Sequence, residues 1–263
     1  MVMLVRSLSD IIIKPGIKQI LRQERTIISE SVKTRADSMM SLTAKDKLFK
    51  LNESSEDKLV ELACEDLENN KVVSLPTDTI YGIAALVNSD EAINKLYDIK
   101  HRNRVKPIAI SCGNIDNVYY YSNVTISESL LSKLLPGPVT VIFERKSTLN
   151  RNLNPDTNLV GIRIPNHPFV RKICMKLNCA IALTSANLSD KPSALKIEEF
   201  REIWPDLSKI FDGGVIGNTI ESRLGSTIVD LSKIGYFQIV REGSAYKETV
   251  QILEENGLRN MQN

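Results

Sequence analysis

Histidine and long apolar runs are scarce in this sequence, and each shortage excludes a class of function. The chain has 2 histidines, so a serine or cysteine hydrolase would have to draw its base from His101 or His167. The G-x-S-x-G turn of many serine nucleophiles is absent as well. No apolar run approaches the roughly 20 residues that a transmembrane helix needs. We therefore expect a soluble protein that does not use a covalent nucleophile.

Cysteine and net charge are also low. The 4 cysteines are dispersed, and only Cys174 and Cys179 are close together, without a second pair or a nearby histidine. Reduced thiols in an intracellular protein are the simpler interpretation than a zinc site. The formal net charge of +2 is too small for a broad nucleic-acid-binding face. Any recognition of anions should therefore be local.

Two common phosphate-binding signatures are missing. No Walker-type G-x-x-x-x-G-K-[ST] occurs, and Asp212-Gly-Gly-Val-Ile-Gly217 does not fit G-x-G-x-x-G. The glycine run is interpreted as a turn.

The N-terminal segment differs from the rest of the chain. Residues 1–50 carry scattered Arg and Lys among Ser, Ile and Leu, which is typical of a mitochondrial presequence, although several acidic residues count against one. The alternatives are a disordered tail or a wrongly chosen start. We expect an extension over residues 1–50 and one catalytic domain over residues 51–263.

Regular patterns begin at Ser54-Ser-Glu-Asp57, which predicts a capping box at the start of a helix. Strands and helices then alternate, and the strands near the C terminus follow each other closely, so we predict an α/β fold with a mixed sheet. Strands are expected at 71–75, 108–110, 138–143, 159–165, 179–184, 226–231 and 236–241, and later helices at 92–97, 169–177 and 246–256.

Two polar clusters follow these elements. The window from Lys100 to Lys106 holds four cations at the junction of a helix and a strand, and Leu183-Thr-Ser-Ala-Asn187 ends an apolar strand. Basic residues at a helix end are often merely solvated. In open α/β sheets, however, ligands bind outside the carboxyl ends of strands, so both clusters could face one crevice.

Several ordered motifs between residues 55 and 245 resemble the Sua5/YrdC family. They are Pro76-Thr-Asp-Thr-Ile-Tyr-Gly82, Lys100-His-Arg102, Lys106-Pro107, Pro136-Gly-Pro-Val-Thr140, Arg163-Ile-Pro-Asn-His-Pro168, Ser185-Ala-Asn187, Gly225-Ser-Thr-Ile-Val-Asp230 and Arg241-Glu-Gly243. The resemblance implies a twisted mixed α/β sheet with flanking helices around a positively charged cavity. It also implies a nucleotidyltransferase, an L-threonylcarbamoyladenylate synthase that makes threonylcarbamoyl-AMP and pyrophosphate from L-threonine, bicarbonate and ATP for the t6A37 modification of tRNA.

The same resemblance assigns residues to roles. Catalytic residues would be Lys100, Arg102, Ser185 and Asn187; ATP would be bound by Arg102, Lys106, Ser185, Ser193 and Arg241; threonine would be bound by Thr79, Arg163, Leu183 and Ser226. Independently of the family, Arg163 stands in an apolar strand and needs a partner if it faces inward. Asp78 and Thr79 could simply cap the next element, and His167 is interpreted as a turn residue.

The chain departs from the family pattern in two places. Many bacterial and archaeal members have Asn-Pro and a later His where this chain has Lys106-Pro107 and Ser111, which leaves open what completes the threonine pocket. The sequence also ends soon after Arg241 and so resembles the short eukaryotic YrdC form.

Further expectations concern partners and location. Mg²⁺ is expected with ATP, without assignable ligands or a tightly bound cofactor. The product would pass to a tRNA threonylcarbamoyltransferase complex, in the cytoplasm and also in mitochondria if residues 1–50 are an address. The alternatives are a double-stranded RNA or tRNA-binding module without catalysis, which the near-neutral charge disfavours, and a carbamoyltransfer domain like that of hydrogenase maturation factors.

Overall fold

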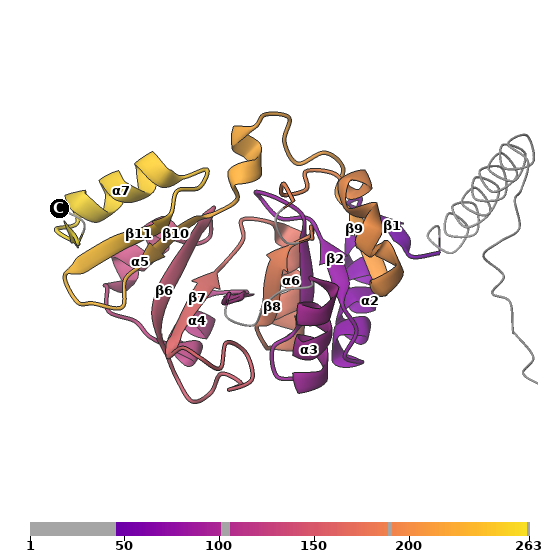
Figure 1. The fold of residues 1–263 in the computed structure, drawn as a ribbon, viewed down its shortest axis with the longest axis horizontal. Helices are drawn as coiled ribbons and strands as arrows, with labels where there is room; N and C mark the ends of the chain where they lie inside the picture. Colours follow the sequence, from indigo (N-terminus) through magenta and orange to yellow (C-terminus); the bar gives the residue numbers. More distant parts are fainter. Residues whose placement is uncertain (1–45, 101–105, 189–190, 262–263) are drawn as a thin grey trace, which may run out of the picture. The chain divides into compact units, whose positions relative to one another are not determined.

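The computed structural model describes residues 46–100, 106–188 and 191–261, and these residues form a layered α/β fold (Figure 1). The contacts between residues separate the chain into two units, Met1–Asp46 and Lys47–Asn263. The elements described below belong to the second unit. The predicted residue Arg102 and nearly all of the segment 1–50 lie outside the described residues.

The described elements alternate along the chain as the sequence patterns predict. In order they are β1 (Leu48–Lys50), α2 (Glu56–Glu68), β2 (Val73–Leu75), β3 (Gly82–Leu86), α3 (Asp90–Ile99), β4 (Ala109–Ser111), α4 (Ile115–Tyr121), β5 (Ser122–Asn123), α5 (Glu128–Leu134), β6 (Val139–Arg145), β7 (Leu159–Arg163), α6 (Pro168–Leu177), β8 (Ile181–Ser185), the 3₁₀ helix η2 (Ile197–Asp206), β9 (Lys209–Asp212), the 3₁₀ helix η3 (Glu221–Leu224), β10 (Thr227–Asp230), β11 (Tyr236–Arg241), α7 (Tyr246–Glu255) and β12 (Arg259–Asn260).

The sheet is mixed, as predicted. Its strands follow the order β1-β9-β2-β3-β8-β4-β7-β6-β10-β11-β12, and β5 pairs with β6 off this path. In the middle of the sheet, β8 runs antiparallel to both of its neighbours, β3 and β4. The pairs β4–β7 and β6–β10 are parallel. The site described below is built around these central strands.

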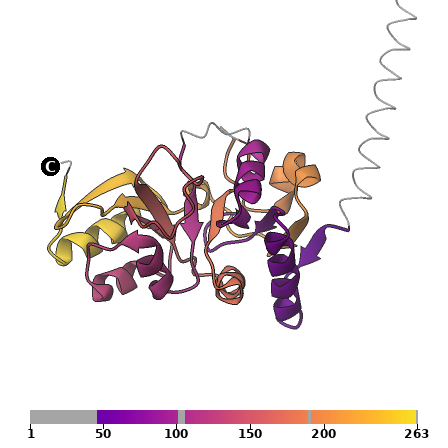
Figure 2. The same cartoon turned by 90° about the horizontal axis from the view of Figure 1, so that it is seen from below.

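Helices cover both faces of the sheet. Figure 2 shows α3 and η2 on one side and α2 and α6 on the other. The apolar face of α2 packs against α6 and the sheet, because residues such as Leu59, Ala63 and Leu67 recur at helical spacing. These residues form one buried cluster with Phe169 and Phe211. This core supports the strands that end at the site.

The predicted capping box is wrong. The N-cap of α2 is Ser55, and its side chain makes no capping hydrogen bond. The hydroxyls of Ser54 and Ser55 instead donate to Asn52 Oδ1, at 2.8 and 2.7 Å. Asn52 Oδ1 also accepts from the backbone N–H of Ser55 at 3.0 Å, so the side chain of Asn52 organises this turn.

The sheet begins before the predicted domain boundary. β1 pairs in parallel with β9, and the rings of Phe49 and Phe211 lie 5.9 Å apart. A boundary after residue 50 would therefore separate β1 from its partner strand.

The glycine run after β9 is an irregular loop rather than the predicted turn. Gly214 has a φ of +78°, a conformation that favours glycine. All four cysteines are buried and unbridged.

Candidate functional site

A cavity of about 190 Å³ lies where several strands of the sheet begin or end. Its walls come from the turn at 77–82, the start of β4, the ends of β7 and β8, and parts of β6, β10 and β11. Two arginines line it, and no described lining residue is acidic. Six predicted site residues are in this lining: Arg163, Leu183, Ser185, Ser193, Ser226 and Arg241.

Arg163 ends β7 with only 7% of its surface exposed. Its guanidinium donates from Nε to Gly137 O at 3.2 Å, from Nη1 to Thr79 Oγ1 at 2.9 Å and from Nη2 to Asp78 Oδ1 at 2.5 Å. Burial lowers the pKa of Arg163, and the adjacent Asp78 carboxylate opposes that shift. The partner that an inward-facing arginine requires is therefore Asp78.

The loop that carries Asp78 and Thr79 is fixed by Thr77. Its hydroxyl oxygen accepts from the backbone N–H of Thr79 at 3.1 Å and of Ile80 at 3.2 Å, and lies 2.7 Å from Ile80 O. A threonine side chain that bonds to the backbone two or three residues ahead stabilises a tight turn. The motif between Pro76 and Gly82 thus orients two side chains toward Arg163.

Lys100 joins the two polar clusters. It is 2% exposed at the end of α3, and its Nζ donates to Ser185 O at 2.7 Å, to Asn187 Oδ1 at 3.1 Å and to Asn187 O. The Ser185 hydroxyl lies 3.4 Å from the same nitrogen. The prediction that the basic window and the Ser-Ala-Asn segment face each other is confirmed for Lys100.

The reason for this meeting differs from the predicted one. Because β4 and β8 are antiparallel, with Ala109 opposite Leu183, the start of β4 lies beside the end of β8. Lys100 precedes β4 in the chain, so it meets the end of β8 at the amino end of a strand rather than at a carboxyl end.

The far wall of the cavity forms around Ser226. Its hydroxyl lies 2.8 Å from Thr140 Oγ1, and Arg241 Nη2 donates to its carbonyl at 2.8 Å. A Cβ on Gly243 would lie 2.3 Å from the backbone of Ser226 and Thr227, so only glycine fits there. The Gly225 and Arg241-Glu-Gly243 motifs thus let two chain segments approach closely.

Ser193 accepts a hydrogen bond from Arg223 of η3, which also forms a salt bridge with Glu199 of η2. Arg223 donates from Nη1 to Ser193 O at 2.6 Å and to Glu199 Oε2 at 2.7 Å, and from Nη2 to Glu199 Oε1 at 2.9 Å. Hydrogen bonding to Arg223 lowers the pKa of Glu199 to about 2. The two η helices are thereby fastened together beside the cavity.

The other predicted residues lie around this lining. Thr79 and Asn187 are buried behind it, in contact with Arg163 and Lys100. Lys106 is exposed next to Pro107, which does line the cavity. The structure therefore brings most of the predicted set together.

Sequence reasoning did not assign three residues of this region. Asp78 pairs with Arg163, Thr140 pairs with Ser226, and Tyr81 lines the cavity while its hydroxyl donates to Gly214 O at 2.8 Å. Asp78 and Tyr81 stand in the motif that begins at Pro76, and Thr140 ends another quoted motif. Motif membership was the available signal, but the pairings depend on long-range contacts.

His167 is the N-cap residue of α6 and precedes Pro168 at the first helical position. Its Nδ1 is buried without a hydrogen-bond partner, and burial lowers the pKa of the imidazole. His167 is therefore a helix N-cap in extended conformation rather than the predicted turn residue.

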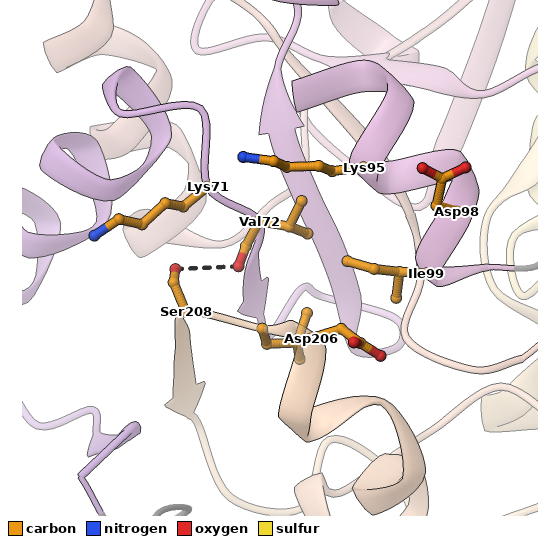
Figure 3. Close-up of a pocket in the computed structure, with 8 residues that line it drawn as sticks. Lys71, Val72, Lys95, Asp98, Ile99, Asp206 and Ser208 are labelled. Atoms are coloured by element: carbon orange, nitrogen blue, oxygen red, sulfur yellow. Dashed lines mark hydrogen bonds between the residues drawn. The ribbon is translucent and has the colours of Figure 1, made fainter. Parts of the chain in front are cut away.

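A second hollow lies away from the predicted residues, between the start of β2, the end of α3 and the η2–β9 junction (Figure 3). Two of its cations are already paired, Lys71 with Asp66 and Lys95 with Glu91. Ser208 Oγ donates to Val72 O at 3.1 Å. Lys71, Lys95 and Ser208 are thus engaged within the protein, and none of the predicted site residues lines this groove.

Metal ligands do not gather in the described part of the chain. No group of three or more His, Cys, Asp or Glu residues there could hold a metal ion. Magnesium arriving with ATP would thus find no carboxylate among the described lining residues of the cavity. Among the helices that the structure describes, none is both long and apolar enough to cross a bilayer.

Comparison with protein families gives one match over most of the chain. The Sua5/YciO/YrdC model, described as "Telomere recombination", matches residues 65–243. These limits enclose the turn at 77–82, Lys100, the β8 end and Arg241.

Individual relatives agree with this match. The bovine (Bos taurus) protein named threonylcarbamoyl-AMP synthase is 48% identical over 198 residues, which cover 74% of this chain and 72% of that protein. The human protein of the same name is 47% identical over 195 residues, covering 73% of this chain and 70% of that protein. The crystal structure of Pyrococcus abyssi Sua5 complexed with L-threonine has a TM-score of 0.71 at 24% identity, covering 81% of this chain and 62% of that one.

Proposed function

The chain belongs to the Sua5/YciO/YrdC family, and from this premise we propose that it is an L-threonylcarbamoyladenylate synthase, a nucleotidyltransferase that joins L-threonine, bicarbonate and ATP. In this reaction the threonine amine adds to the carbon of bicarbonate, and water leaves as the carbamate forms. A carbamate oxygen then attacks the α-phosphorus of ATP, the bond to the bridging oxygen breaks, and pyrophosphate departs.

The observation that carries the proposal is the buried guanidinium of Arg163 in the cavity wall. A guanidinium has one N–H on Nε and two on each terminal nitrogen. The contacts to Gly137, Thr79 and Asp78 engage one N–H of each nitrogen. One N–H therefore remains on each terminal nitrogen, and arginine is well suited to binding a carboxylate through two such donors. The carboxylate of threonine is the proposed partner.

Hydroxyl groups nearby suit the rest of the amino acid. Ser226 and Thr140 lie on the wall formed by β10 and β6, and Leu183 supplies an apolar surface from β8. Hydroxyls can donate to and accept from the threonine hydroxyl, and a leucine can contact its methyl group.

We assign Lys100 to the place where the reacting groups would meet, because it contacts Ser185 of the cavity lining. Its ammonium is held at the end of β8 by Ser185 and Asn187, which preorganises a positive charge in a buried site. Negative charge moves onto the leaving pyrophosphate during adenylate formation, and a fixed cation stabilises that charge without reorganising. We assign this role to Lys100, with Arg102 as a second cation from the same window.

The cavity size indicates how the substrates share the site. A volume of about 190 Å³ is below the roughly 300–1,000 Å³ of most small-molecule pockets, so it would enclose the amino acid rather than both substrates. ATP would extend from the cavity past Ser193, Lys106 and Arg241. Lys106 and Arg241 are exposed, in positions where phosphates can reach them.

An RNA-binding module is less consistent with these positions. Lys100 is 2% exposed and Arg163 is 7% exposed. Nonspecific RNA binding depends on accessible lysines and arginines, so these two buried cations would have no role in it, although Lys106 and Arg241 are exposed.

The proposed product determines the reaction that must follow. Threonylcarbamoyl-AMP is an activated mixed anhydride, so a transferase acting on tRNA adenosine would consume it. Delivery to a tRNA threonylcarbamoyltransferase complex is part of this proposal.

The test is a direct assay of the purified protein with ATP, bicarbonate and labelled threonine. We expect pyrophosphate release that needs both threonine and bicarbonate, together with a labelled adenylate. Release of orthophosphate from ATP alone, without a threonine requirement, would contradict the proposal.

A further inference from the structure

Asp78 is the carboxylate that accompanies Arg163 in the cavity wall. Its Oδ1 lies 2.5 Å from Arg163 Nη2, and the side chains are only 13% and 8% exposed. Its other oxygen, Oδ2, is buried without a hydrogen-bond partner. Within the described residues, the side chain of Asp78 therefore hydrogen-bonds to Arg163 and to no other group, so Arg163 is the partner that explains its burial.

Three contacts define the plane and rotation of the Arg163 guanidinium. Gly137 O holds Nε, Thr79 Oγ1 holds Nη1, and Asp78 Oδ1 holds Nη2. Of these acceptors Asp78 alone is charged, and hydrogen bonds to charged acceptors are about twice as strong as neutral ones. The direction in which the two remaining N–H groups point therefore depends most strongly on Asp78.

We propose that Asp78 is a positioning residue of the threonine site, which aims the remaining N–H groups of Arg163 at the substrate carboxylate. This inference rests on the proposed function. Asp78 acts through Arg163 and is assigned no contact with the substrate. It also compensates the guanidinium charge, since a buried cation without a partner is strongly destabilising.

A second ion-paired carboxylate provides a matched control. Asp66 in α2 is 2% exposed and pairs with Lys71 at 3.0 Å and with Lys209 at 2.7 Å. It does not line the cavity. Removing its charge also disturbs a buried, ion-paired carboxylate, but one that has no contact with Arg163.

The experiment compares Asp78→Asn, Asp78→Ala and Asp66→Asn with the wild-type full chain. For each, the KM for threonine, the KM for ATP and kcat are measured by pyrophosphate release, and Tm is recorded. Asn keeps an oxygen acceptor without the charge, so Asp78→Asn should raise the threonine KM by about three- to tenfold. Asp78→Ala removes the acceptor as well and should raise it by more than about tenfold. The KM for ATP should stay within about twofold in both variants.

The control separates positioning from general damage. Asp66→Asn should lower Tm while leaving the KM for threonine unchanged. The inference is overturned if both Asp78 variants keep the wild-type threonine KM, or if threonine and ATP requirements rise together. If Asp78→Ala does not fold, the ratio of the two KM values in Asp78→Asn decides. A wild-type protein without threonine-dependent pyrophosphate release would instead refute the proposed function.

Discussion

At the scale of single residues, the cations of this site are held by oxygen atoms of the protein. Arg163 is fixed by a carbonyl, a hydroxyl and a carboxylate, and Lys100 by the carbonyls and side chains at the end of β8. Such contacts keep buried charges from shifting when substrates bind. Substitutions should therefore affect binding and catalysis selectively.

Arg163→Lys tests whether threonine binding needs two N–H donors in one plane. Lysine keeps the positive charge but cannot offer two N–H groups in one plane, so the KM for threonine should rise by about tenfold or more. The KM for ATP should change little, because the nucleotide is assigned to other residues. Steady-state rates with each substrate varied in turn measure both values. An unchanged threonine KM in the folded variant would remove Arg163 from the threonine site.

Lys100→Ala tests the role assigned to the ammonium group. If Lys100 stabilises charge that develops during adenylate formation, kcat should fall by roughly 10²-fold. Tm should fall as well, since carbonyl oxygens of Ser185 and Asn187 would lose a buried donor. Single-turnover measurements separate the two effects. A change confined to ATP affinity would reduce Lys100 to a residue that binds the ground state.

At the scale of elements, the sequence patterns identify strands better than they identify neighbours. β6, β7, β10 and β11 were predicted within two residues, because apolar runs bounded by turn residues define them. β3 was missed: Gly82-Ile-Ala-Ala-Leu86 is buried on both faces, so it shows no alternation of apolar and polar residues. The apolar pattern also does not predict that β4 pairs with β8 in antiparallel direction.

The same contrast holds for the site, where the sequence predicts the contributing segments better than the contacts between them. The ordered motifs predicted which segments contribute side chains, and most of these surround one cavity. The pairing of Asp78 with Arg163 joins residues 85 positions apart, so no local spacing indicates it. Contacts of this kind depend on the order of strands in the sheet, which single-sequence periodicity does not determine.

The link between η2 and η3 gives a prediction about pH. Because Arg223 lowers the pKa of Glu199 from 4.5 to about 2, the folded state binds a proton there less readily than the unfolded state. The stabilisation is therefore complete above pH 4.5 and is lost as the pH falls toward 2. Glu199→Gln should lower Tm slightly at neutral pH, and the difference from wild type should shrink through this range.

Thermal unfolding over a pH series measures this effect, and Arg223→Ala provides the reciprocal variant. Glu199→Gln should lose all of this pH dependence and Arg223→Ala most of it, because the backbone N–H of Leu195 still lowers the pKa of Glu199 when Arg223 is absent. A difference from wild type that stays constant from neutral pH to pH 2 would show that the pair contributes no linked protonation.

At the scale of the whole molecule, the described part of the sheet starts at β1. Leu48–Lys50 pair with β9, Phe49 contacts Phe211, and Leu51 N donates to Asp212 O at 2.8 Å. The strand lies at the end of the strand order, far from β7 and β11, which carry Arg163 and Arg241. It should contribute to stability without contributing to chemistry.

Two shortened chains test this division. A chain that starts at Lys47 keeps β1, and one that starts at Leu51 lacks it. Both should have wild-type kcat and KM values, but the shorter chain should melt several degrees lower, at about 2–4 °C for each kcal/mol lost. Equal Tm values would show that β1 is dispensable, and loss of activity in the longer chain would show that residues 1–46 contribute to the enzyme.

The pairing of β6 with β10 has a consequence for synthesis on the ribosome. Val139 lies opposite Thr227, so this edge of β6 has no partner strand until a segment much later in the sequence has been synthesised. Until β10 emerges, the nascent chain exposes an apolar strand edge, which is prone to aggregation, and the cavity lacks the wall that carries Ser226 and Arg241. Chains stalled before residue 227 should therefore be protease-sensitive and bound by chaperones, and substrate can first assist folding when translation is nearly complete.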